Sequence, residues 1–204
     1  MHIRHLAATA LLLAAAGAAQ ATITTVTSQA TFVSLTGATV DGFTDLTINS
    51  DLGVATLARS GYSVSTQTDL FVVPVASAIA LSTGVFNDTL TLGSFTSPLL
   101  AVGANFYGTN VLGEVTSGAL SVTATDANGL TRTVSVGGGS ASGFLGFVSD
   151  VPLVSVIVGM TTPNTNVYAS LDNVSISAVP EPGPWLMLLA GGAVMLRGAA
   201  RRRA

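Results

Sequence analysis

The central part of the chain alternates apolar and polar residues in many short stretches. Residues 120–125 read Leu-Ser-Val-Thr-Ala-Thr, and residues 130–136 read Leu-Thr-Arg-Thr-Val-Ser-Val. Successive side chains of a strand point to opposite faces of its sheet, so this period of two predicts strands with one buried face. Turn residues interrupt the pattern about every 8 to 12 residues, and no helical period competes with it. The body of the chain is therefore predicted to fold as an all-β sandwich or barrel.

One pair of these stretches predicts a specific hairpin. Asn128 and Gly129 lie between the two stretches quoted above, and both residue types tolerate the positive φ angles that a tight reversal needs. The full set of predicted strands is 22–27, 31–35, 45–49, 62–67, 70–75, 89–92, 99–107, 119–125, 130–136, 143–149, 153–159 and 167–177.

Several kinds of chemistry are excluded because the body lacks the residue types that they need. The chain has no cysteine, and both histidines, His2 and His5, precede the first apolar run. Disulfides, thiolate or histidine metal sites and Ser-His-Asp or Cys-His catalytic groups are therefore excluded from the body. A glycosidase would need two opposed carboxylates, but most of the aspartates lie beside turn residues. We expect the protein not to be an enzyme.

Charge is distributed unevenly along the chain. All seven basic residues are arginines, and only Arg59 and Arg132 lie between residues 22 and 179, against nine acidic residues. The body therefore carries a formal charge of −7, although the whole chain carries −3. Such an acidic surface repels phosphate backbones, so we expect no binding to nucleic acid.

The first 21 residues have the three parts of an export signal. Arg4 lies in a short basic start, residues 6–16 form an unbroken apolar run, and Ala19 and Ala21 give a small-x-small cleavage site. This combination is typical of a secretory signal peptide, here predicted as a helix that is removed by cleavage after Ala21. The mature protein would then begin at Thr22.

Residues 179–204 have a different character from the body. Pro180 and Pro182 preclude a helix or a central strand there, so the chain should be extended just after the body. Residues 184–200 are mostly apolar and would rise about 25 Å as a transmembrane helix. The predicted anchor residues are Trp185, Leu186, Leu188, Leu189 and Leu196, and the basic stop-transfer residues that follow are Arg201, Arg202 and Arg203. The arginines suit the cytoplasmic side of a membrane.

This tail resembles the PEP-CTERM sorting signal of Gram-negative bacteria, in which a Pro-Glu-Pro motif precedes an apolar helix and a terminal arginine cluster. The resemblance implies that Pro180, Glu181 and Pro182 are recognised by an exosortase-type membrane protease in bacteria that make exopolysaccharide. It implies a protein that is exported, anchored transiently in the inner membrane, and then released to the cell surface or the extracellular matrix. The predicted domains are a signal peptide (1–21), a β-sandwich domain (22–178) and a sorting and anchor tail (179–204).

Late in the body, residues 143–150, 154–158 and 169–176 resemble the closing strands of jelly-roll domains of the concanavalin-like, carbohydrate-binding type. The resemblance implies a jelly-roll-like sandwich, and a Leu-Asp-Asn-Val stretch that often lies beside a structural calcium in such domains. The acid to test with Asp172 is an early one, Asp41 or Asp45, because first and last strands often neighbour one another in sandwiches. The sequence predicts no cofactor other than this candidate structural calcium.

Two roles for the body remain open. The first is a structural or adhesive protein in an exopolysaccharide matrix, and the second is a carbohydrate-binding module that recognises the exopolysaccharide itself. Sugar binding usually uses exposed aromatic rings, and the body has no tryptophan. Its tyrosines are Tyr62, Tyr107 and Tyr168, while Phe144 and Phe147 are expected to pack in the core.

Overall fold

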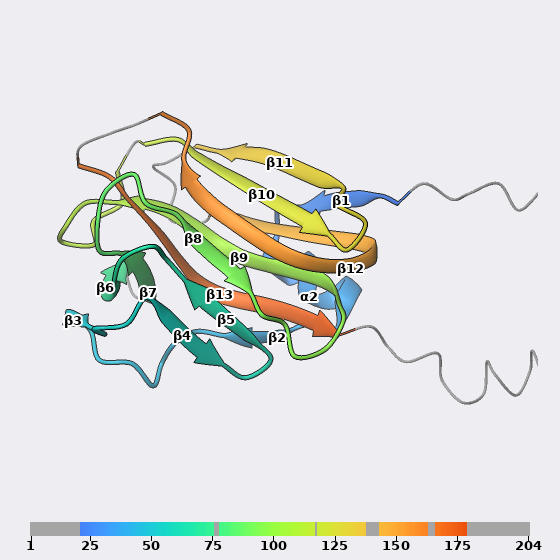
Figure 1. The fold of residues 1–204 in the computed structure, drawn as a ribbon, viewed down its shortest axis with the longest axis horizontal. Coiled ribbons are helices and arrows are strands. Elements are labelled where there is room, and N and C mark those ends of the chain that lie inside the picture. The colour runs from blue at the N-terminus through green and yellow to red at the C-terminus, as the bar shows by residue number, and fades with distance from the viewer. Residues whose placement is uncertain (1–20, 76–77, 117, 138–142, 163–165, 179–204) are drawn as a thin grey trace, which may run out of the picture.

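The computed structural model describes residues 21–75, 78–116, 118–137, 143–162 and 166–178. Strands dominate this part of the chain, with one short helix among them (Figure 1). The elements are, in order, β1 (Ile23–Val26), α2 (Gln29–Thr36), β2 (Thr39–Asp41), β3 (Ser50–Asp51), β4 (Thr56–Arg59), β5 (Tyr62–Ser65), β6 (Leu70–Val75), β7 (Ala78–Thr83), β8 (Leu90–Gly93), β9 (Leu99–Thr109), β10 (Leu120–Asp126), β11 (Thr131–Val136), β12 (Phe144–Met160) and β13 (Tyr168–Ala178).

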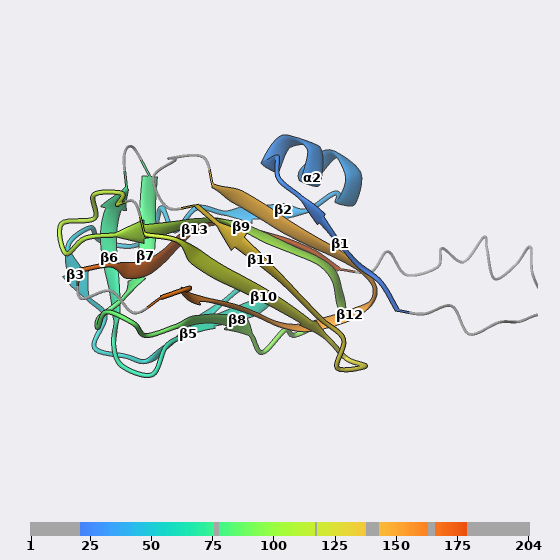
Figure 2. The ribbon, with the colours of Figure 1, turned by 90° about the horizontal axis from the view of Figure 1, so that it is seen from above.

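The strands form one antiparallel sheet that curls into two facing layers, and β12 belongs to both. Its first half, residues 144–149, pairs with β1 and β9, whereas its second half, residues 153–160, pairs with β8 and β10. The first layer continues from β9 through β13 to β2, β7 and β6, and the second continues from β8 to β5 and β4 (Figures 1 and 2). The prediction of an all-β antiparallel sandwich is confirmed.

The main hydrophobic core lies between the two layers. Strand β10 shows the predicted alternation, because Leu120, Val122 and Ala124 are completely buried while the residues between them are partly exposed. The core also takes Phe147 from β12, as predicted. Burial of apolar surface at about 25 cal/mol per Å² makes this core the main source of stability.

The prediction of a strand at 31–35 is wrong, because this segment lies in helix α2. The side chain of Ser28 caps the start of the helix by accepting a hydrogen bond from the Thr31 N–H, and Gly37 ends it with φ of 65°. Phe32 is the residue that the helix buries, and its ring lies 5.4 Å from the ring of Phe144. Phe144 thus packs in a smaller cluster on the outer face of the first layer. A single apolar anchor leaves almost no helical periodicity to detect in the sequence.

The prediction of a strand at 45–49 is also wrong. The chain turns there, with the Leu46 N–H donating to the carbonyl of Phe43, and both Phe43 and Asn49 have positive φ. Asp45 accepts two hydrogen bonds from Arg59, and these favour the turn over an extended backbone. The sequence pattern also missed β2, β3, β4 and β7, of which the first three are only two to four residues long.

The predicted β10–β11 hairpin is confirmed, with a different turn from the one expected. Residues 120–125 pair with residues 131–136. Only Gly129 has a positive φ, of 81°. The carboxylate of Asp126 organises the turn instead by accepting hydrogen bonds from the N–H groups of Asn128 and Leu130.

The two predicted flanking helices lie outside the described residues. These are the export signal up to residue 20, including Ala19, and the tail with its membrane segment. Within the part of the chain that the structure covers, no helix has the length and apolar character needed to cross a bilayer.

Gly146 lets the Phe32 ring approach the sheet, and this predicts the effect of a small substitution. A Cβ added at Gly146 would collide with the Phe32 ring, whereas a Cβ at Gly137 would meet nothing within 4 Å. We expect Gly146→Ala to lower the free energy of unfolding by about 1–3 kcal/mol. Gly137→Ala should change it by less than about 0.5 kcal/mol. Urea denaturation measures both, and equal midpoints for the two variants would contradict the packing described here.

Candidate functional site

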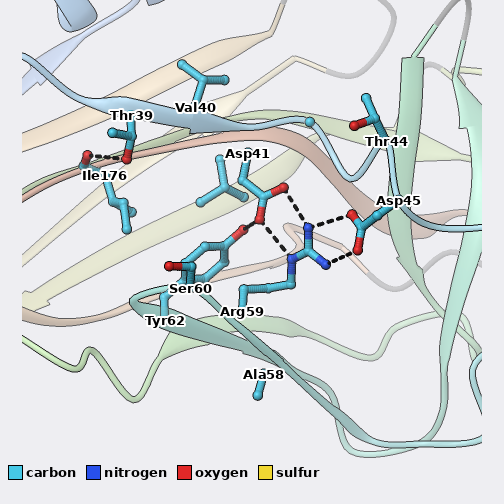
Figure 3. A pocket seen from close by; sticks show the side chains of 12 residues that line it. Thr39, Val40, Asp41, Thr44, Asp45, Ala58, Arg59, Ser60, Tyr62 and Ile176 are labelled. Atoms are coloured by element: carbon cyan, nitrogen blue, oxygen red, sulfur yellow. Dashed lines mark hydrogen bonds and ion pairs between the residues drawn. The ribbon is translucent and has the colours of Figure 1, made fainter.

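A polar depression lies where the two layers meet at one edge of the sandwich. One side comes from β2, the turn that follows it and the last residues of β13, and the other side comes from the β4–β5 hairpin (Figure 3). Its volume is about 670 Å³, within the range of small-molecule sites. The lining residues are Thr39, Val40, Asp41, Gly42, Thr44, Asp45, Ala58, Arg59, Ser60, Tyr62, Val174 and Ile176.

Arg59 is clamped between two carboxylates at the centre of this depression. Its Nε and Nη2 donate to Asp41 Oδ2 and Oδ1 at 2.8 and 2.9 Å. Its Nη1 and Nη2 donate to Asp45 Oδ2 and Oδ1, each at 2.7 Å. Two bidentate pairs on one guanidinium fix its plane and position. We call these three residues the arginine clamp.

Two aromatic residues, Phe43 and Tyr62, contact the arginine clamp. The guanidinium carbon of Arg59 lies 5.4 Å from the centre of the Phe43 ring, a cation–π distance. Tyr62 donates its hydroxyl to Asp41 Oδ2 at 2.8 Å, and the Phe43 N–H donates to Asp41 Oδ1 at 3.1 Å. Asp41 belongs to the first layer and Arg59 and Tyr62 to the second, so these contacts also tie the layers together.

The clamp holds all three of its groups in their charged forms. The hydrogen bonds from Arg59 lower the pKa of Asp45 to about 2. Burial would raise the pKa of Asp41, but the hydrogen bonds from Arg59, the Phe43 N–H and Tyr62 outweigh it, so this pKa is also lowered. The hydrogen bonds that Arg59 donates to Asp45 and Asp41 raise its pKa. Burial, then the hydrogen bond to Asp41, raise the pKa of Tyr62, which stays neutral.

These charges restrict what the depression can do. A general acid must carry a proton near neutral pH, and neither carboxylate of the clamp does so. An anionic ligand would need a cation with free donors, but Arg59 already serves two carboxylates and the clamp as a whole carries one negative charge. The site is therefore suited to binding a neutral polar ligand by hydrogen bonds.

The edge of the depression offers groups that such a ligand could contact. Thr44 and Ser60 are exposed, and their hydroxyls form no hydrogen bond within the described part of the chain. The side chain of Asp45 is 62% exposed, so its oxygens keep open acceptor positions beside Arg59. Val40, which is 46% exposed, adds an apolar patch to the same surface.

Asp172 lies apart from this site, in a buried cluster on the opposite face of the first layer. Its Oδ1 accepts hydrogen bonds from Asn105, Tyr107 and Asn173, at 2.7, 3.2 and 3.1 Å. Its Oδ2 is buried and has no partner in the described part of the protein. Burial raises the pKa of Asp172 despite the three hydrogen bonds.

The proposed calcium pair of Asp41 and Asp172 is not brought together. Asp41 pairs across the strands with Val174, which faces the main core, whereas Asp172 shares its face with Tyr107 in a different cluster. No group of three acidic, histidine or cysteine residues that could hold a metal occurs among the described residues. Binding of structural calcium by Asp172 with an early acid is not tested by the structure and stays a prediction.

Of the three tyrosines considered for sugar stacking, two are unsuited to it. Tyr62 and Tyr107 are only 3% and 4% exposed. Tyr168 is partly exposed and lines a smaller pocket of about 150 Å³ together with Phe71.

Sequence reasoning found Asp41 and Asp45 but missed Arg59, on which the site depends. A usable signal was present, because a body with two arginines and nine acidic residues should pair each arginine with acids. The predicted tail residues lie outside the described part of the chain, so the structure does not bear on them. They are Pro180, Glu181, Pro182, Trp185, Leu186, Leu188, Leu189, Leu196, Arg201, Arg202 and Arg203.

The chain matches no protein-family model and no curated protein. Among solved structures, it is similar to the CBM22-1 xylan-binding domain of Paenibacillus barcinonensis Xyn10C, with 14% identity over 69% of this chain and 94% of that one, at a TM-score of 0.32. It is also similar to CtCBM11, with 13% identity over 81% of this chain and 99% of that one, at a TM-score of 0.26. At TM-scores this low, neither similarity bears on what this chain binds.

The lowered pKa of Asp41 predicts how stability depends on pH. A carboxylate whose pKa is below its unfolded value of 3.8 adds stability above that value and loses it as pH falls through the folded pKa. We expect Asp41→Asn to lower the free energy of unfolding by about 1–3 kcal/mol at pH 6. This difference from the wild type should shrink steadily below pH 3.8.

Asp69→Asn is the matched control, because Asp69 is exposed and its side chain forms no ion pair with the arginines of the described residues. It should stay within about 0.5 kcal/mol of the wild type at every pH. Thermal or urea unfolding from pH 2 to 7 gives the comparison. A difference for Asp41→Asn that is constant over this range would contradict the ion pair.

Proposed function

We propose that the protein is an exported, non-catalytic adhesive protein of the cell surface or extracellular matrix, and that it binds neutral polysaccharide at the depression around the arginine clamp. The observation that carries the proposal is the clamp itself. It presents rigid hydrogen-bonding groups that are charged near neutral pH, and its one cation already serves two carboxylates.

The choice of ligand class follows from what the clamp excludes. Phosphate, sulfate and uronate groups would meet a site with a net negative charge, on a body whose formal charge is −7. Apolar ligands would have to desolvate two ionised carboxylates, which costs several kcal/mol. A neutral ligand that is rich in hydroxyl groups can instead donate to Asp45 and exchange hydrogen bonds with Thr44 and Ser60.

The shape and the mixed surface of the site also suit a sugar ring. A pyranose has polar hydroxyls at its edge and an apolar C–H face. Val40 and Ile176 offer apolar contact inside the same depression that carries the hydroxyls and the clamp. Because Arg59 is fixed on both sides, little side-chain entropy would be lost on binding, which favours affinity.

The predicted export signal and sorting tail support a location at the cell surface or in the extracellular matrix for this binding. The export signal with its cleavage site at Ala19 and Ala21, and the Pro-Glu-Pro tail, suit a protein that passes through the inner membrane and is released by an exosortase-type protease. Bacteria with such a sorting system make exopolysaccharide, which would supply the ligand at the site of release.

Polysaccharide binding can be tested by affinity electrophoresis through gels that contain xylan, a neutral β-glucan or acidic alginate. We expect at least one neutral polymer to retard the protein and alginate not to. Asp45→Ala removes the exposed acceptor and should weaken retardation at least about tenfold, equivalent to about 1.4 kcal/mol. Ser60→Ala should weaken it less.

Asp69→Ala removes the same charge at an exposed position away from the site and should bind as the wild type does. Circular dichroism spectra verify that each variant is folded. Absence of retardation by every neutral polymer, or equal retardation of Asp45→Ala and the wild type, would refute the proposed site.

Sorting by the tail can be tested separately by mass spectrometry of the protein released from cells with and without the exosortase-type protease. We expect the released protein to lack the residues beyond the Pro-Glu-Pro motif when the protease is present. Without the protease, the intact chain should remain with the membrane fraction. A released protein that still ends at Ala204 would contradict this part of the proposal.

A further inference from the structure

Three contacts join Thr22, the residue before β1, to Asp150 at the bend of β12. The backbone nitrogen of Thr22 lies 2.8 Å from Asp150 Oδ1, and the Thr22 hydroxyl lies 3.3 Å from Oδ2. In return, the Asp150 N–H donates to the Thr22 carbonyl at 3.4 Å. Both residues are on the surface, and the contact spans 128 positions of the sequence.

Thr22 is also the residue at which the mature chain is predicted to begin. We propose that cleavage after Ala21 turns the Thr22 nitrogen into an α-ammonium group that forms an ion pair with Asp150 and so fastens the edge strand β1 to the sheet. This inference rests on the export part of the proposed function and is independent of the ligand of the depression.

The chemistry of the cleavage supplies the cation. Hydrolysis breaks the bond between the Ala21 carbonyl carbon and the Thr22 nitrogen, and water gives its hydroxyl group to the carbonyl carbon and a hydrogen to the nitrogen. The new amine then takes a proton from solvent, because an α-amine has an ordinary pKa of about 7.7–8.0. A neutral N–H donor is thereby replaced by a charged one, without any movement of the chain.

Asp150 has no other cation to pair with in the described part of the chain. The ion pairs there are those of Arg59, which is held by Asp41 and Asp45. Arg132 belongs to β11 and pairs across the strands with Ala124. The carboxylate of Asp150 accepts side-chain hydrogen bonds only from Thr22 among the described residues. The α-ammonium is thus the counterion that this carboxylate lacks.

The position of the ion pair gives it a structural role. Strand β1 is an edge strand, held through pairing of Ile23 with Ser149 and of Val26 with Gly146. Val26 packs in the cluster under α2, and Figure 2 shows β1 running beside β12 below that helix. Fixing Thr22, the residue before β1, limits fraying at the point where the mature chain starts.

The composition of the chain allows a direct test. The sequence has no lysine, so the α-amine is the only primary amine of the mature protein and an amine-reactive acylating reagent modifies that site alone. The protein is purified from cells that export it, its N-terminus is read by mass spectrometry, and its rate of acylation is measured from pH 6 to 10. An ion pair keeps the amine protonated and unreactive to higher pH.

We expect the mature chain to begin at Thr22 and its amine to have a pKa about half a unit higher than in Asp150→Asn. At pH 7 this makes acylation of the wild type about threefold slower. Asp69→Asn, which removes the same charge elsewhere, should match the wild type. In urea the difference should vanish, and this comparison of native with unfolded wild type holds even if Asp150→Asn is unstable.

Two results would overturn the inference. One is a mature chain that begins at any residue other than Thr22. The other is the same pH midpoint for acylation in native wild type, Asp150→Asn and unfolded wild type. The second result leaves export and polysaccharide binding untouched, and loss of polysaccharide binding would leave the acylation result standing, so the two proposals fail separately.

Discussion

The fold depends on one strand that is long enough to serve both layers. Residues 144–149 of β12 pair with β1 and β9, and residues 153–160 pair with β8 and β10. Because the strand bends between these parts, the sheet curls back on itself and encloses the core without a covalent cross-link. A chain without cysteine has to close its sandwich by strand pairing and packing alone.

Cations are scarce in this body, and Arg59 has a structural position. Arg59 joins the two layers at the edge by holding Asp41 and Asp45, and the same contacts build the floor of the depression. Asp150 at the bend of β12 has only Thr22 as a side-chain partner among the described residues. With nine acidic residues and two arginines, a new positive charge at the N-terminus would have a larger effect here than in a protein with balanced charge.

The sequence predicted the strands best where one face of a strand is buried against the core. In β10 every second residue is buried, and its hairpin with β11 was placed correctly. The sequence prediction failed where contacts with distant residues set the backbone conformation. Helix α2 has a single buried residue, Phe32, which packs on Gly146, a residue distant in sequence. The turn after β2 is set by Asp41 and Asp45, whose partner Arg59 comes from the other layer.

The sequence by itself determined the class of fold, the acidic character of the body and the absence of common catalytic groups, because these follow from composition and from a period of two. It also located Asp41 and Asp45 as candidates. Only the tertiary structure decided that these two carboxylates share Arg59 and that Asp172 lies on the opposite face of the layer. The reason is physical: alternation records which face of a strand is buried, but which strands lie opposite one another depends on the bend of β12 and on packing between distant residues.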